Sequence, residues 1–212
     1  MKMEIAQLRV ALADTAENCS RELSASELDL FCQYYELVIR WNDRLHLTTI
    51  THPLQFARRH LIESAFAVER LQQNITKIWD LGSGLGVPGI PFSVLRPDLS
   101  VVLIEANKKK AIFLKEAVDC LNLRNVSVCN VRLESLARLE RFSCILVRAL
   151  EEMGKMIPGI LNLGIECPQI LIFGGSEVRS QLLSHLDLQL KLESELLPFS
   201  ENRWLYSLTR ST

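Results

Sequence analysis

The chain of 212 residues has no long apolar segment. No run of apolar residues approaches the roughly 18–20 that are needed to cross a bilayer. Residues 1–19 include acidic side chains and interrupt their apolar positions every few residues, which is not the pattern of a signal peptide. Since 48% of the residues are hydrophobic, a largely disordered chain is also excluded. We therefore expect a soluble globular protein of the cytoplasm.

The chain also lacks the residue spacings that bind metal ions. Its six cysteines include no Cys-x-x-Cys pair, and its four histidines are dispersed. Because nothing directs the chain to an oxidising compartment, we expect six reduced thiols, most of them small core residues. The pattern predicts no metal site.

Neither sign of charge is in excess. The chain has 24 Lys and Arg against 25 Asp and Glu, a formal net charge of −1. This balance argues against a protein that coats nucleic acid through bulk charge. A nucleic-acid partner would need a local basic face.

The first part of the chain has no glycine or proline before Pro53, which favours helices. Ser24 and Glu27 have the spacing of a capping box that opens a helix. A stripe of apolar and aromatic residues follows at intervals of three and four, a helical period: Leu28, Leu30, Phe31, Tyr34, Tyr35, Leu37, Val38 and Trp41. Residues 56–71 predict a second amphipathic helix. We expect the aromatic residues of the stripe to lie in the core.

From Lys77 onward, short apolar runs alternate with helical stretches, the pattern of βαβ units and a mainly parallel sheet. The runs are 78–81, 101–104, 126–128, 144–147 and 170–173, and 188–209 predicts an antiparallel pair of strands. We therefore expect an α/β Rossmann-like fold with helices on both faces of the sheet. Residues 1–74 would form an N-terminal helical cap, and residues 75–212 the ligand-binding domain, in one compact monomeric unit.

A glycine loop is the strongest local motif. Gly82, Gly84 and Gly86 alternate between a predicted strand and a predicted helix, the context that a nucleotide-type loop requires. Glycine allows positive φ and lets a ligand approach the backbone. Glu105 closes the next strand, where a carboxylate can accept hydrogen bonds from both hydroxyls of a ribose. Asp80, before the first glycine, can face a cation, which favours S-adenosylmethionine over an anionic dinucleotide.

At this point the sequence resembles the ribosomal RNA small subunit methyltransferase G family, also called glucose-inhibited division protein B. The resemblance covers roughly residues 34–175. The motifs that carry it are Gly82 to Gly86 followed by Val87-Pro88-Gly89-Ile90-Pro91, Arg132-Leu133-Glu134, Val147-Arg148-Ala149, Trp41-Asn42, Leu47-Thr48, His60 to Ser64, and Lys109-Lys110 with Phe113-Leu114. The resemblance implies a class I methyltransferase fold and methylation of guanine N7 in 16S ribosomal RNA, with S-adenosylmethionine as cofactor.

The resemblance also implies functional residues. It implies cofactor contacts at Gly82, Val87, Leu133, Glu134 and Arg148, to which the glycine-loop argument adds Gly84 and Glu105. From their basic side chains, we expect RNA contacts at Arg58, Arg59, Lys109 and Arg132. His60, Lys108, Lys110 and Lys115 are further candidates for RNA contacts. Lysines at the start of a helix are often simply exposed to solvent. The sequence departs from the family's pattern at His46, Glu63 and Val147. It also has Phe173-Gly174-Gly175 where the family has a late Lys-Gly.

Guanine N7 has a lone pair and no proton, so its methylation needs no general base. We therefore predict no catalytic base and regard Arg148 as a positioning group. Three alternatives remain open: a methyltransferase acting on another RNA, a protein or a small molecule, an RNA-binding factor without turnover, and an NAD-dependent dehydrogenase. Asp80 argues against the dehydrogenase, and the glycine loop with Glu105 argues against a factor without turnover.

Overall fold

The computed structural model describes residues 1–13, 19, 21–136, 143–148, 153–163, 166–186 and 189–210. Within them a seven-stranded sheet has the order β3-β2-β1-β4-β5-β7-β6. The strands are β1 (Lys77–Leu81), β2 (Ser100–Ile104), β3 (Val126–Cys129), β4 (Ser143–Arg148), β5 (Gln169–Gly175), β6 (Leu190–Leu196) and β7 (Arg203–Arg210). The first five strands are parallel, and β7 pairs antiparallel with both β5 and β6. This confirms the predicted sheet and its antiparallel tail.

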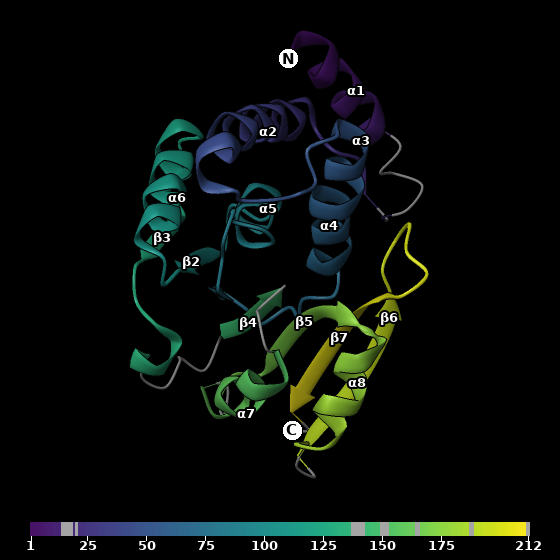
Figure 1. Cartoon of the computed structure of the whole chain (residues 1–212). Coiled ribbons are helices and arrows are strands. Elements are labelled where there is room, and N and C mark those ends of the chain that lie inside the picture. The colour runs from purple at the N-terminus through teal and green to yellow at the C-terminus, as the bar shows by residue number, and fades with distance from the viewer. Residues whose placement is uncertain are drawn as a thin grey trace.

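Helices cover both faces of the sheet (Figure 1). They are α1 (Lys2–Ala13), α2 (Ala25–Leu45), α3 (Pro53–Phe56), the π-helix η2 (Ala57–Ile62), α4 (Glu63–Val68), α5 (Gly89–Leu95), α6 (Lys108–Cys120), the 3₁₀ turn η3 (Leu133–Ser135), α7 (Met153–Leu163) and α8 (Ser176–Leu183). Alternate residues of β4 enter two separate cores. Cys144 and Leu146 pack with α1 to α6, whereas Ile145 and Val147 pack with α7 and α8. Strands buried on both faces explain the continuous apolar runs in the sequence.

The N-terminal helices share a core with the sheet. The predicted capping box opens α2, since the Ser24 side chain accepts from the Glu27 N–H and Glu27 reaches back to the Ser24 N–H. Tyr34 and Tyr35 are buried, as predicted. The Tyr34 hydroxyl donates to the carbonyl of Leu85, so α2 supports the glycine loop directly.

The second predicted helix differs from the expectation. Residues 56–71 are not one α-helix: helical structure begins at Pro53, ends at Val68 and contains the π-helix η2 in its middle. The Glu63 N–H donates to the carbonyl of Arg58, five residues earlier. A π-turn widens the helix and changes which side chains share a face, and such turns are frequent at functional sites.

All six cysteines are free. Four are buried, as expected, while Cys120 is exposed and Cys129 is partly exposed. No helix in the described ranges is long and apolar enough to cross a membrane. Within the same ranges, no three His, Cys, Asp or Glu side chains gather as metal ligands would.

Candidate active site

The loop between β1 and α5 is shaped by its glycines. Gly82, Gly84 and Gly86 have φ values of 70°, 58° and 96°, in the region that side chains disfavour. A Cβ on Gly86 would lie 2.5 Å from Cδ1 of Ile90, whereas a Cβ on Gly84 would have its nearest neighbour at 3.8 Å. The loop is therefore packed tightly at Gly86 and presents open backbone at Gly84, where a ligand can approach.

Glu105, just after β2, braces this loop. Its Oε2 accepts a hydrogen bond from the Gly84 N–H at 2.8 Å, and its Oε1 accepts one from the Asn107 N–H at 2.7 Å. A carboxylate has about four acceptor positions. Glu105 is 8% exposed and lines a cavity, so it keeps acceptor positions for the hydroxyls of a ribose.

Asp80 lies beneath the loop and does not line the cavity. Its side chain is buried and accepts the Gly89 N–H at 3.2 Å. Burial raises the pKa of Asp80 to about 7, against the opposing effects of the Ser83 and Gly89 hydrogen bonds and of Arg148. The carboxylate accepts from a backbone donor at the start of α5 that has no partner within the helix, so Asp80 would act on a cationic ligand through water or through space.

The cavity has a volume of about 970 Å³ and follows the carboxyl ends of the parallel strands. We call the part next to β1, β2 and β3 the glycine-loop half. It is lined by Leu81, Gly82, Ser83, Gly84, Leu85, Val87, Glu105, Asn107, Lys110, Arg132, Leu133 and Glu134. We call the part next to β4, β5 and β7 the arginine half. It is lined by Thr48, Arg59, His60, Arg148, Phe173, Gly174, Gly175 and Arg203.

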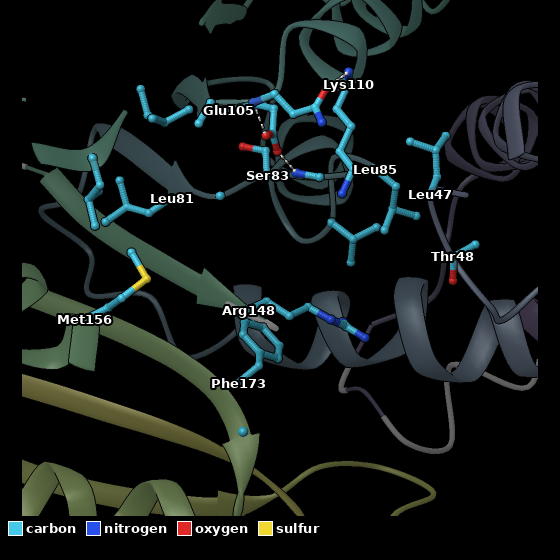
Figure 2. Close-up of a pocket in the computed structure, with 18 of the residues that line it drawn as sticks. Leu47, Thr48, Leu81, Ser83, Leu85, Glu105, Lys110, Arg148, Met156 and Phe173 are labelled. Atoms are coloured by element: carbon cyan, nitrogen blue, oxygen red, sulfur yellow. Dashed lines mark hydrogen bonds between the residues drawn. The ribbon is translucent and has the colours of Figure 1, made fainter. Parts of the chain in front are cut away.

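The two halves face each other in Figure 2, where Arg148 and Phe173 lie together, away from Glu105 and Lys110. Phe173 is the residue of β5 directly opposite Arg148 of β4. The guanidinium carbon of Arg148 lies 5.6 Å from the centre of the Phe173 ring. Ligands of open α/β sheets bind at this edge, so the cavity has the position and the size of a ligand site.

Hydrogen bonds fix the protonation state of His60 in the arginine half. Nη2 of Arg148 lies 3.2 Å from Nδ1 of His60, and Nε2 of His60 lies 3.2 Å from Oγ1 of Thr48. A guanidinium only donates, so Nδ1 accepts and Nε2 carries the proton of a neutral ring. Burial lowers the pKa of His60 well below its usual value, and Arg148, Arg203 and Arg59 lower it further.

Arg148 stays charged despite its burial. Its Nη2 also donates to the carbonyl of Arg59. Burial lowers the pKa of Arg148 to about 10, while Glu63 raises it. A pKa of about 10 still leaves the guanidinium protonated at neutral pH. The arginine half is therefore positively charged.

Comparison with known proteins identifies the family. The rRNA small subunit methyltransferase G model matches residues 27–201. The chain belongs to this family. Ribosomal RNA small subunit methyltransferase G of Chromobacterium violaceum is 35% identical over 157 residues, which are 74% of this chain and 73% of that protein. The protein of the same name from Xylella fastidiosa strain M23 is 41% identical over 131 residues, which are 62% of this chain and 59% of that protein.

Solved structures confirm the fold class. Precorrin-6y C5,15-methyltransferase from Geobacter metallireducens has a TM-score of 0.56 at 16% identity, covering 80% of this chain and 96% of its own. Ribosomal protein L11 methylase from Lactobacillus delbrueckii has a TM-score of 0.57 at 14% identity, covering 73% of this chain and 80% of its own. At these identities the likeness shows the fold alone, which is that of class I methyltransferases.

The residues expected to bind cofactor in this family all line the cavity: Gly82, Gly84, Val87, Glu105, Leu133, Glu134 and Arg148. Six of them lie in the glycine-loop half, and Leu133 and Glu134 stand on the turn η3. Only Arg148 lies in the arginine half. Ala149, the last residue of its motif, lies outside the described residues.

The expected RNA contacts are divided. Arg59 and Arg132 line the cavity, whereas Arg58 and Lys109 do not. The guanidinium carbon of Arg58 lies 4.6 Å from the ring centre of Phe199, and Lys110 lines the cavity in place of Lys109. Adjacent residues of a helix point in different directions, so only one of each basic pair faces the cavity.

Arg203 was not assigned from the sequence. It lies at the start of β7, opposite Gly175 of β5, and lines the arginine half. Only the register of β5 and β7 brings it there. Gly174 stands where the family has its late Lys-Gly. A larger residue at Gly174 would clash, because its Cβ would lie 2.5 Å from Cγ2 of Val178.

Proposed function

We propose that this chain transfers the methyl group of S-adenosylmethionine to N7 of a guanine in 16S ribosomal RNA. The observation that carries the proposal is one cavity whose halves differ in chemistry: glycine backbone and Glu105 on one side, Arg148 and Phe173 on the other. Family membership supports methyl transfer to small-subunit RNA. A ribosomal RNA substrate would place the activity in the cytoplasm.

The glycine-loop half fits the cofactor. Its backbone at Gly84 is open, because no protein atom beyond its chain neighbours lies closer than 3.8 Å to the position that a Cβ would take, so a ligand can approach it closely. Glu105 keeps acceptor positions for ribose hydroxyls, Val87 gives an apolar wall, and the backbone of Leu133 and Glu134 stands where an adenine edge would meet it. When bound, S-adenosylmethionine supplies an electrophilic methyl group, and the N7 lone pair takes it while the carbon–sulfur electrons return to sulfur.

The arginine half fits the acceptor. Phe173 is buried and packs beneath the Arg148 guanidinium, whose positive charge suits an electron-rich base. No proton leaves N7 in this reaction, so the residues act by position alone. A guanine would have to be unpaired or leave its stack to reach Arg148.

The proposal is tested with purified protein, S-adenosylmethionine carrying a labelled methyl group, and three acceptors. These are small-subunit particles from cells without the gene, protein-free 16S RNA from the same cells, and particles from unaltered cells. We expect label in the first, less label in the second and none in the third. The nearly neutral net charge makes extra surface from the particle useful. Transfer to none of the three, by protein that binds the cofactor, would point to another acceptor.

A further inference from the structure

Three arginines surround one buried carboxylate in the arginine half. Glu63 is fully buried, and its Oε1 forms a hydrogen-bonded ion pair with Nη1 of Arg203. Its Oε2 lies 3.3 Å from Nη2 of Arg148, and its Oε1 lies 3.5 Å from Nε of Arg59. The cluster joins the contiguous helices η2 and α4 to β4 and β7, which lie far from them in the sequence.

The cluster has an excess of positive charge. Three guanidinium groups face the single carboxylate of Glu63, and His60 beside them is neutral, so two positive charges (three minus one) are not compensated within the cluster. Burial raises the pKa of Glu63 while the three arginines lower it. Arg59, Arg148 and Arg203 all line the cavity, so the excess charge faces the ligand space.

Two of the buried donors of this cluster lack partners. Among the described residues, neither Nη1 of Arg148 nor Nε of Arg59 makes a hydrogen bond. Arg148 is only 9% exposed, and in Figure 2 its side chain extends into the space between the drawn residues. Buried donors without partners are rare in folded proteins, and a ligand is one of the groups that satisfy them. An anionic oxygen would accept a hydrogen bond from such a donor and would also offset the excess positive charge of the cluster.

The wider turn of η2 contributes to this arrangement. It presents Arg59 and His60 to the cavity while Glu63, the residue after η2, is directed into the core. The Arg59 carbonyl accepts from Arg148, and His60 accepts from the same nitrogen. Nη2 of Arg148 is thereby held by the protein, whereas Nη1, which is also buried, makes no hydrogen bond within the described residues.

We infer that Arg59, Arg148 and Arg203 bind a phosphodiester group of the RNA strand beside the methylated guanine. This inference rests on the proposed function. The methionyl carboxylate of the cofactor has similar oxygens. However, the glycine loop and Glu105 would place the cofactor over β1, β2 and β3, whereas Arg203 comes from β7, on the other side of β4. Arg59 lies with Arg203 because both contact Glu63. Planar guanidinium groups suit the paired oxygens of a phosphate.

The variants that test this are Arg203→Gln, Arg203→Lys and Arg59→Gln, with Arg124→Gln as the matched control. Arg124 is exposed, precedes β3 and does not line the cavity. The RNA probes are unmethylated small-subunit particles and a short single-stranded RNA oligonucleotide, each titrated over a range of salt concentrations. The small-molecule probes are S-adenosylhomocysteine, which has the carboxylate, and methylthioadenosine, which lacks it.

We expect Arg203→Gln and Arg59→Gln to bind RNA about tenfold more weakly at low salt, as the loss of a charged hydrogen bond does. The slope of log affinity against log salt would fall by about 0.7 for each lost phosphate contact. Arg203→Lys would keep the slope because it keeps the charge. Both small molecules would bind all variants as they bind the unaltered protein.

Weaker binding of S-adenosylhomocysteine alone, with methylthioadenosine unchanged, would assign the arginines to the cofactor and overturn the inference. Unchanged RNA affinity and salt slope in Arg203→Gln and Arg59→Gln would also overturn it. If the unaltered protein fails to methylate the particles, the proposed function fails. The oligonucleotide titration then still decides whether the arginines bind phosphate.

Discussion

The protonation of the buried Asp80 side chain should depend on whether a cationic cofactor is bound. Its pKa is raised to about 7, mainly by burial, and Arg148 lowers it while Glu105 raises it. A cationic cofactor in the cavity would favour the ionised carboxylate through space. Binding would then release a proton below pH 7.

We therefore predict that cofactor affinity rises between pH 6 and pH 8, by up to about tenfold per pH unit below the free-state pKa. Asp80→Asn retains an acceptor for the Gly89 N–H and should bind more weakly at pH 8, with little of this dependence. Calorimetric titration in two buffers of different ionisation enthalpy measures the released proton. Equal proton release by both proteins would contradict the role of Asp80.

His60 predicts a different pH dependence, in stability. Its folded-state pKa lies well below the usual value, so between that pKa and about 6.5 only the unfolded chain takes up the proton. Stability from neutral His60 is present above about pH 6.5 and is lost as the pH falls, by up to about 1.4 kcal/mol per pH unit. In His60→Gln, whose amide oxygen can accept from Arg148, this loss should be absent. Urea unfolding from pH 5 to pH 8 compares the two, and parallel curves would contradict the prediction.

Two glycines of the loop between β1 and α5 allow a matched pair of substitutions. Gly86→Ala would place a methyl group 2.5 Å from Ile90 and 3.1 Å from Leu114, at a φ of 96°. Gly84→Ala would have only the Gly82 carbonyl oxygen nearby, at an ordinary contact distance of 3.8 Å, at a φ of 58°. We expect Gly84→Ala to lose about 1 kcal/mol of stability from backbone strain, and Gly86→Ala to lose about 2–4 kcal/mol because overpacking adds to it. Thermal unfolding tests this order, and equal losses would refute it.

The same elements show what the sequence could and could not predict. Short apolar runs predicted the five parallel strands, because strands inside a parallel sheet are buried on both faces. The antiparallel pair β6 and β7 was predicted from the loose alternation within 188–209 instead. The π-turn η2 was missed because one extra residue per turn hardly changes the period of the apolar residues. Its contact with Arg148 also depends on β4, which is far away in the sequence. Arg203 was missed because its position depends on the register of β7 with β5.

At the level of the whole molecule, we propose that residues 1–74 and 75–212 form one cooperative unit. Their side chains share one of the two cores, the one that includes Phe31, Phe56 and Ile78. The Tyr34 hydroxyl binds the glycine loop, and Nε1 of Trp41 donates to Glu116 of α6 at 3.0 Å. Cutting the chain at residue 75 would expose this core to water.

We predict that urea unfolds the protein in one transition, seen alike by circular dichroism and by tryptophan fluorescence. Trp41 reports on the N-terminal helices, and Trp79 and Trp204 on the sheet. Replacing Trp41 with Phe leaves only the reporters of the sheet and should give the same midpoint after correction for its stability change. Two separate midpoints would contradict a single unit.

The central claim is a methyl group placed on N7 of one guanine in 16S ribosomal RNA. The most direct measurement is mass spectrometry of mapped 16S RNA fragments from cells with and without the gene. We predict that one 7-methylguanosine disappears without the gene, returns with the unaltered gene, and does not return with Arg148→Ala expressed at the same level. An unchanged content of 7-methylguanosine in every fragment would contradict the claim.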